Sequence, residues 1–148
     1  MFETIVLAID GSAPSDRAVD YAVSVAKESG SRIVAVHVNE LMGGRAAGPV
    51  HVDEDEILEK IRGRVKQMSE DGVKVDLQVA STMTGGPAHV IADVAAKESA
   101  DLIITGTRGH TALAGVFLGS VAQRLLNLAV CPVLVIPDSG AGRGESAN

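Results

Sequence analysis

The sequence predicts an α/β protein: a single-domain, three-layer sandwich built on a five-stranded parallel sheet with four helices. Two observations support this class. Short apolar runs rich in Val and Ile alternate with amphipathic stretches along the chain, as strands buried on both faces alternate with helices. Glycine and proline residues separate these runs and mark where elements begin and end. Such alternation favours parallel strands joined by right-handed crossovers.

The first third of the chain predicts two strands with a helix between them. Residues 4–9 (TIVLAI) form a short apolar run that ends in a turn at Asp-Gly-Ser, as a buried strand would. A helix is expected over residues 14–28, because proline suits its first turn and Gly30 stops it. Residues 32–38 (RIVAVHV) predict the second strand.

A second helix is expected after an exposed loop. Residues 39–56 are rich in glycine and charge, which is typical of a surface loop. Before Gly72, apolar side chains recur at helical spacing: Ile57, Leu58, Ile61, Val65 and Met68. We interpret the acidic run at 53–56 as the start of this helix, where carboxylates favour the helix dipole, with metal binding as the weaker alternative.

The remaining elements follow in order along the chain. They are an alternating edge strand at 73–80, a helix opening at Gly86-Pro87, a central strand at 101–105, a helix at about 116–128 and a fifth strand at 131–137. The side chains of the third helix expected to face inward are Val90, Ile91, Val94 and Ala95. We expect one domain over residues 1–137 and a flexible polar tail over 138–148.

The strand order follows from the need to cover both faces of the sheet. If the first helix covers one face and a later helix the other, the order reverses once, and we predict 3-2-1-4-5. Ligands of open α/β sheets bind outside the carboxyl ends of the strands where the order reverses. The segments leaving the first and fourth strands there are Asp10-Gly11-Ser12 and the loop after Thr105.

Composition and charge exclude several classes of protein. With 148 residues, 46% hydrophobic and 22% charged, the chain is globular and large enough to bury a core. A net charge of −6 and 2% aromatic residues argue against nucleic-acid binding.

No signal-peptide pattern is present, and no apolar stretch reaches the roughly 20 residues of a membrane span, so we expect a cytoplasmic protein without membrane insertion. Cys131 is the only cysteine, so no internal disulfide is possible, and we interpret it as a small buried side chain.

A glycine-dense loop is the strongest candidate for a binding site. Gly106, Gly109, Gly119 and Ser120 have the spacing G-x2-G-x9-G-S, the last pair lying near a helix start. Glycines let backbone amides approach a ligand, and a helix N-terminus favours an anion. The residues therefore predict a phosphate cradle, with a loop needed only for close packing as the alternative. Neither a Walker A loop nor a G-x-G-x-x-G after the first strand is present.

The chain resembles the universal stress protein family, of the nucleotide-binding type. The resemblance covers residues 2–137 and rests on five stretches in order: IVLAIDGS, VHV, GGPAHVI, ADLIITGTRGHTALAGVFLGSVAQRLL and CPVLVIP. The G-x2-G-x9-G-S spacing is the ATP signature of that family. The resemblance implies a Rossmann-like fold, ATP as the ligand with Mg²⁺ possible, and a regulatory role in the stress response.

The resemblance also implies which residues bind the nucleotide. These are Ala8, Ile9 and Asp10 on the adenosine side, Val38 at adenine, Thr105, Gly106, Arg108 and Gly109 past the ribose and phosphates, and Gly119, Ser120 and Val121 at the phosphates. Asp10 is expected near the ribose or a bound divalent ion. Family members often carry another hydroxyl after that valine, where this chain has Ala122, which puts one phosphate contact in doubt and implies either a lower affinity or a shorter nucleotide.

Each candidate residue has a structural alternative. Asp10 could simply form a turn and cap the first helix, and Arg108 could be an exposed cation. His37 is interpreted as a hydrogen-bonded residue at a strand end, and His110 as a solvated neighbour of the phosphates. No metal site is predicted, because the four histidines do not have the spacing of metal ligands; they are His37, His51, His89 and His110. No catalytic residue is assigned, since Ser120 lies on no G-x-S-x-G elbow.

Several functions remain open at the level of sequence. The first is a regulator whose bound ATP biases its conformation or its choice of an unknown protein partner, with the 39–53 loop as the switch. A slow ATPase or self-phosphorylating enzyme is disfavoured, because no general base, Walker B acid or carboxylate pair is evident. AMP or cyclic AMP would suit much the same pocket. A nucleotide-independent interaction module is the last alternative, and the family resemblance implies a homodimer through the edge strand at 132–136.

Overall fold

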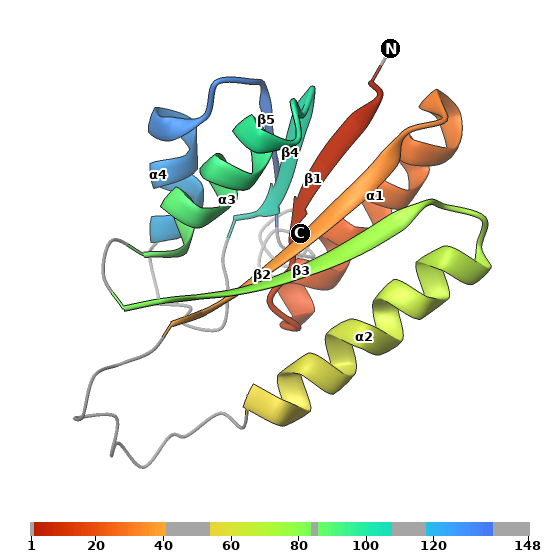
Figure 1. The fold of residues 1–148 in the computed structure, drawn as a ribbon, viewed down its shortest axis with the longest axis horizontal. Helices are drawn as coiled ribbons and strands as arrows, with labels where there is room; N and C mark the ends of the chain where they lie inside the picture. Colours follow the sequence, from red (N-terminus) through yellow and green to blue (C-terminus); the bar gives the residue numbers. More distant parts are fainter. Residues whose placement is uncertain (1, 41–53, 84–85, 108–117, 138–148) are drawn as a thin grey trace, which may run out of the picture.

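The protein is a sandwich in which five strands alternate with four helices along the described part of the chain (Figure 1). The computed structural model describes residues 2–40, 54–83, 86–107 and 118–137. The strands are β1 (Thr4–Ala8), β2 (Arg32–Glu40), β3 (Val75–Thr82), β4 (Leu102–Gly106) and β5 (Val133–Ile136). The helices are α1 (Ala13–Ser29), α2 (Glu54–Glu70), α3 (Pro87–Lys97) and α4 (Ser120–Leu128).

The strands form one parallel sheet in the order β3-β2-β1-β4-β5, which confirms the predicted class and order. The register pairs Ala8 with Val36 and Leu7 with Ile104, so β1, β2 and β4 run side by side with their carboxyl ends at the same edge. The order reverses between β1 and β4, because the chain moves outward to β2 and β3 before it returns to the other side of β1.

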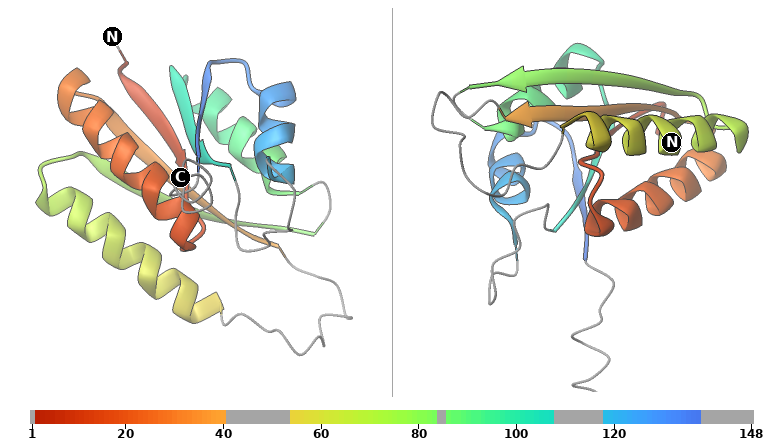
Figure 2. Two further views of the ribbon diagram at one scale, coloured as in Figure 1. Left: turned by 180° about the vertical axis from the view of Figure 1, so that it is seen from behind. Right: turned by 90° about the horizontal axis from the view of Figure 1, so that it is seen from below.

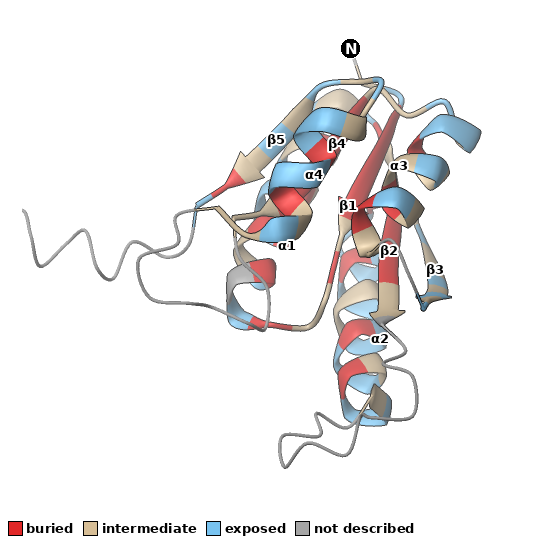
Figure 3. Cartoon of the chain, turned by 90° about the vertical axis from the view of Figure 1, so that its left-hand side faces the viewer, coloured by how far each residue is buried: buried red, intermediate tan, exposed pale blue. Residues whose placement is uncertain are grey.

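Two apolar layers hold the helices against the sheet. Helices α1 and α2 cover one face, and α3 and α4 cover the other (Figure 2). Side chains of β1 alternate between these layers: Ile5 and Leu7 face α1 and α2, whereas Val6 faces α3 and α4, and all three are fully buried. The inner strands are therefore buried along most of their length, while β3 and β5 at the edges are partly exposed (Figure 3).

Among the predicted boundaries that differ from the structure are the start of the last helix and the end of the second strand. The helix expected at 116–128 begins at Ser120, because Gly119 has an extended backbone and serves as its N-cap residue. Strand β2 continues to Glu40, since the ladder with β3 pairs Glu40 with Thr82; residues 39 and 40, predicted to belong to the exposed loop, belong to the strand instead. The acidic residues 54–56 form the first turn of α2, as predicted. The remainder of the proposed switch loop, 41–53, and the tail at 138–148 lie outside the described residues.

The inward face of α3 and the burial of Cys131 also need correction. Ala88, Ile91 and Ala95 are the buried side chains of α3, whereas Val90 and Val94 are half-buried. The helix presents one narrow stripe to the sheet, and the small Ala88 lets its first turn lie close. The Cys131 side chain is only half-buried, and burial raises the pKa of its thiol. Among the described residues, no helix is long and apolar enough to cross a bilayer.

Asp101 joins the starts of β1 and β4 and makes the stability of the fold depend on pH. Its carboxylate accepts hydrogen bonds from the amides of Thr4 (3.0 Å) and Glu3 (2.8 Å). These two bonds hold the pKa of Asp101 below its usual range. Because the pKa is lower in the folded state, the stabilisation is present above the unfolded pKa of roughly 3.9 and is lost as pH falls through the folded value.

We expect Asp101→Asn to lower the free energy of unfolding at pH 7, because the amide is a weaker acceptor for two backbone N–H groups. The difference from the wild type should shrink below roughly pH 4, where the aspartate itself becomes protonated. Urea unfolding of both proteins at pH 7, 5 and 3 measures this. A difference that stays constant down to pH 3 would contradict the assigned role of Asp101.

Candidate functional site

A cavity of about 280 Å³ lies at the carboxyl ends of β1, β2 and β4, where the strand order reverses. The four helices also contribute to its walls, each through its N-terminal part. Nine of the eleven residues predicted to bind the nucleotide line it: Ala8, Ile9, Asp10, Val38, Thr105, Gly106, Gly119, Ser120 and Val121. The other two, Arg108 and Gly109, lie outside the described residues. The fold thus brings these nine together, and their role in binding stays a prediction.

The turn after β1 forms one wall of the cavity and fixes Asp10. Its backbone amide donates to the Ser15 hydroxyl (3.2 Å), and its Oδ1 accepts from the amide (2.8 Å) and hydroxyl of Ser12. Ser12 in turn caps α1 by accepting from the Ser15 amide. Gly11 has φ +78°, a left-handed conformation that glycine adopts without strain. Asp10 therefore has the predicted turn role and also lines the cavity.

The end of β2 forms a second wall with His37, Val38 and Asn39. The His37 ring is buried and hydrogen-bonded at both nitrogens, Nδ1 lying 3.2 Å from the Ile9 carbonyl and Nε2 lying 2.7 Å from Glu54 Oε1. This confirms the interpretation of His37 as a hydrogen-bonded histidine at a strand end. No pattern in the sequence indicated that its second partner comes from α2, because the two residues are seventeen positions apart.

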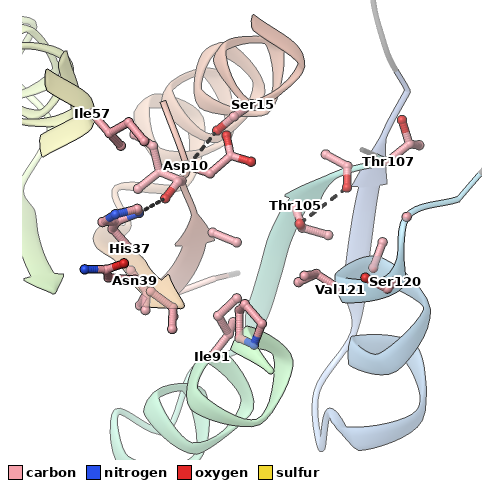
Figure 4. A pocket seen from close by; sticks show the side chains of 18 of the residues that line it. Asp10, Ser15, His37, Asn39, Ile57, Ile91, Thr105, Thr107, Ser120 and Val121 are labelled. Carbon is pink, nitrogen blue, oxygen red and sulfur yellow. Dashed lines mark hydrogen bonds between the residues drawn. The ribbon is translucent and has the colours of Figure 1, made fainter. Parts of the chain in front are cut away.

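The opposite wall consists of the end of β4 and the start of α4 (Figure 4). The Gly119 amide donates to the Thr107 carbonyl, so the chain re-enters beside the end of β4 just before the helix. Gly119 brings no side-chain hydrogen bond to the helix start, and the first turn of α4 contains no acidic residue. By contrast, α1 has a serine cap and Asp16, and α2 has three acidic residues. The first amides of α4 therefore suit an anion at Ser120 and Val121.

Sequence reasoning missed several cavity residues, both polar and apolar. Ile57 of α2 and Ile91 of α3 follow the helical periodicity of core residues, and nothing in that pattern tells a cavity wall from a packed core. Pro87 at the start of α3 also lines the cavity, as does Ala122, the residue expected beside the phosphates. Helices α2 and α3 thus each contribute an apolar side chain to the cavity, and the start of α4 contributes the Ser120 hydroxyl.

The charged groups of the cavity are few. Among the described residues that line it, the titratable side chains are Asp10, His37 and Glu54. In the described ranges, no three histidine, cysteine or acidic side chains gather where they could hold a metal ion. A ligand carrying negative charge would accordingly meet backbone amides and the dipole of α4 at one end and the carboxylates at the other.

Comparison with known proteins agrees with this architecture. The model of the universal stress protein family matches residues 1–137. Universal stress protein MJ0531 of Methanocaldococcus jannaschii is 36% identical, over 92% of this chain and 82% of its own length. The structure of hypothetical protein MJ0577 has the same fold, with a TM-score of 0.79 and 23% identity over 95% of this chain and 99% of its own. The structure of the universal stress protein from Archaeoglobus fulgidus in complex with dAMP has a TM-score of 0.66 and 26% identity, covering 92% and 98% of the two chains. This chain therefore belongs to the universal stress protein family.

Proposed function

We propose that this protein binds an adenine nucleotide in the cavity between β1, β2 and α4, and that ATP with Mg²⁺ is its ligand. Occupancy of the site would act as a conformational or partner switch in a cytoplasmic stress response. The observation that carries the proposal is the N-terminus of α4, which has no side-chain cap and no acidic residue in its first turn. This helix start lines the cavity where the strand order of the sheet reverses. The related Archaeoglobus fulgidus protein, which was solved with dAMP, supports the choice of an adenine nucleotide.

The cavity residues suit the parts of a nucleotide. Val38, Ile57 and Ile91 offer an apolar surface for the base. Asp10 lies at the polar side of the turn, where its carboxylate fits a ribose hydroxyl or a magnesium ion that is also held by phosphate oxygens. The amides at Ser120 and Val121 would donate to the phosphates.

The cavity also bears on how many phosphates the bound nucleotide carries. Ala122 lines the cavity and supplies only a methyl group, so the hydroxyl donor that the family resemblance implies after Val121 is missing here. Each lost hydrogen bond to a charged group weakens binding by about 1.5–3 kcal/mol. AMP or cyclic AMP would lose less than ATP from this change, and both belong in the binding assay beside ATP.

Calorimetry with purified protein tests the proposal. We expect heat of binding with ATP and Mg²⁺, and an adenine nucleotide released when the purified protein is heat-denatured and analysed by mass spectrometry. Parallel titrations with AMP, cyclic AMP and GTP rank phosphate length and base. An absence of co-purifying nucleotide, together with no heat from any adenine compound, would refute nucleotide binding.

We further propose a homodimer through the edge strand at 132–136, whose assembly the nucleotide would influence, and a regulatory protein partner. β5 is an edge strand paired only with β4. Leu134 on this strand, Val130 before it and Leu126 on α4 are exposed large apolar side chains. An uncovered apolar edge strand favours pairing with a second chain.

A further inference from the structure

We propose that Asn39 is a specificity-determining residue that recognises the base of the bound nucleotide. Its side-chain amide would accept a hydrogen bond from the 6-amino group of adenine and donate one to the neighbouring ring nitrogen N7. This inference rests on the proposed function, because it names the residue of the same cavity that selects adenine.

Asn39 lies on a part of β2 that extends beyond the end of β1. The ladder between these two strands ends at the pair Ala8–Val36, whereas the ladder between β2 and β3 includes the later pair Asn39–Ser81. One edge of β2 is therefore held by β3 at this point, while the strand end lines the cavity. The backbone of Asn39 is thus fixed before a ligand binds, and only the torsions of a short side chain remain to be ordered.

The side-chain amide of Asn39 has no hydrogen-bond partner among the described residues. Its neighbours in the cavity wall differ from it: the His37 ring is hydrogen-bonded at both nitrogens, and Asp10 accepts from Ser12. Asn39 is half-buried and lies next to His37 in the lining of the cavity (Figure 4). An amide that is partly removed from water in this way offers one acceptor and two donor hydrogens to a ligand.

The position of Asn39 in the sheet makes the base its partner. In the order β2-β1-β4, the strand that carries Asn39 is two strands away from β4, beside which α4 begins. Neighbouring strands lie about 4.8 Å apart, so this separation is about 10 Å. A nucleotide whose phosphates are held by the first amides of α4 would therefore have its other end, the base, at the end of β2.

Apolar side chains beside Asn39 suit the two faces of a purine ring. Val38, the preceding residue, packs with the layer of α3 and α4. Ile57 of α2 and Ile91 of α3 also line the cavity, and they come from helices on opposite faces of the sheet. A ring bound among these side chains makes apolar contacts with its faces, which leaves its polar edge for the amide of Asn39.

The amide distinguishes adenine from guanine at that edge of the base. Adenine presents a donor, the 6-amino group, beside the acceptor N7, and an asparagine amide matches this pair with its own acceptor and donor. Guanine presents two acceptors there, O6 and N7, so the carbonyl oxygen of the amide would face another acceptor. Asn39 would therefore favour ATP over GTP.

Two substitutions separate the roles of the amide atoms. Asn39→Ala removes both hydrogen bonds. Asn39→Asp has nearly the same shape and keeps an acceptor for the 6-amino group, but it places a second acceptor opposite N7. Ser81→Ala is the matched control, because Ser81 is the exposed β3 partner of Asn39 and does not line the cavity. Thermal unfolding of each variant verifies that the fold is retained.

Calorimetry with three nucleotides, each with Mg²⁺, measures the proposed contact. They are ATP, 7-deaza-ATP, which lacks the N7 acceptor, and purine riboside triphosphate, which lacks the 6-amino group. We expect the wild type and Ser81→Ala to bind each analogue about ten-fold more weakly than ATP, the size of one lost hydrogen bond. In Asn39→Ala the three nucleotides should bind about equally.

Asn39→Asp gives a result of opposite sign. Its added charge weakens all three nucleotides alike, so their ratio within the variant is the informative quantity. We expect Asn39→Asp to bind 7-deaza-ATP more tightly than ATP, because the carboxylate faces the N7 acceptor in ATP alone. This reversal needs direct contact between residue 39 and the base, and an effect on folding would not produce it.

The outcomes keep the two proposals apart. If the ratios between ATP and its analogues were the same in the wild type and in Asn39→Ala, the role of Asn39 would be overturned and nucleotide binding would stand. An equal loss of affinity for all three nucleotides in Asn39→Ala would also overturn it, since that describes a contact with the ribose, the phosphates or the fold. A wild type that binds none of the three would refute the proposed function, and the role of Asn39 with it.

Discussion

Ser120→Asp is expected to abolish nucleotide binding without weakening the fold. Ser120 is the exposed first residue of α4 and lines the cavity. An aspartate in the first turn of a helix interacts favourably with the helix dipole, by about 0.3–1 kcal/mol, so the free energy of unfolding should stay level or rise. The same carboxylate would occupy the place proposed for the phosphates. Two unit charges 4 Å apart near a protein surface repel by about 4 kcal/mol, so affinity for ATP should fall at least about 100-fold.

Calorimetry and thermal unfolding of the same preparation measure the two effects of Ser120→Asp separately. Ser24→Asp is the matched control, since it makes the same substitution at an exposed residue of α1 that does not line the cavity. Ser120→Ala removes the hydroxyl alone and should weaken binding only a few-fold, because the backbone amides remain. If Ser120→Asp bound ATP as tightly as Ser24→Asp, the phosphates would have to lie elsewhere.

Leu134→Lys is expected to convert the proposed dimer to monomers. Leu134 is 38% exposed on the edge strand β5. An antiparallel pairing centred on residues 132–136 brings the two copies of this side chain opposite one another. Two lysines there would replace a buried apolar contact by like charges, which disfavour cross-strand pairing. We expect the dissociation constant of the dimer to rise about 100-fold or more, a change of roughly 2.7 kcal/mol.

Sedimentation of the wild type and of Leu134→Lys at micromolar concentration measures this change. Val79→Lys offers a matched control, because Val79 is similarly exposed (44%) on the other edge strand, β3. That control should sediment as the wild type does. A wild type that is monomeric at these concentrations would refute the proposed dimer, and a dimer unaffected by Leu134→Lys would place the interface elsewhere.

The fold was largely predictable from local patterns. A strand covered on both faces needs mostly apolar side chains, and the runs at residues 4–9 and 101–105 are apolar except at their ends. The alternating run at 73–80 likewise belongs to an edge strand, β3, with one side open to solvent. The start of α4 was less predictable, since Gly119 takes an extended backbone through its bond to Thr107 in the preceding segment.

The glycine and serine residues of the cavity were also visible in the sequence, because glycines at this spacing are typical of a backbone that approaches a ligand. Their common position on one cavity followed from the strand order, which places the ends of β1 and β4 side by side. The cavity walls from α2 and α3 were not visible. Ile57 and Ile91 have the same periodicity whether they fill a core or face a ligand.

The sequence by itself determined the α/β class, the strand order and the polar side of the site, because these depend on periodicity and on the backbone freedom of glycine, which are local properties. Only the tertiary structure decided how α2 meets the cavity. His37 and Glu54 come from different elements, and neither residue type implies the other as a partner. They pair because the connection from β2 through α2 to β3 packs on the sheet, which brings the start of α2 to the ends of β1 and β2. No local pattern in the sequence encodes this contact between separate elements.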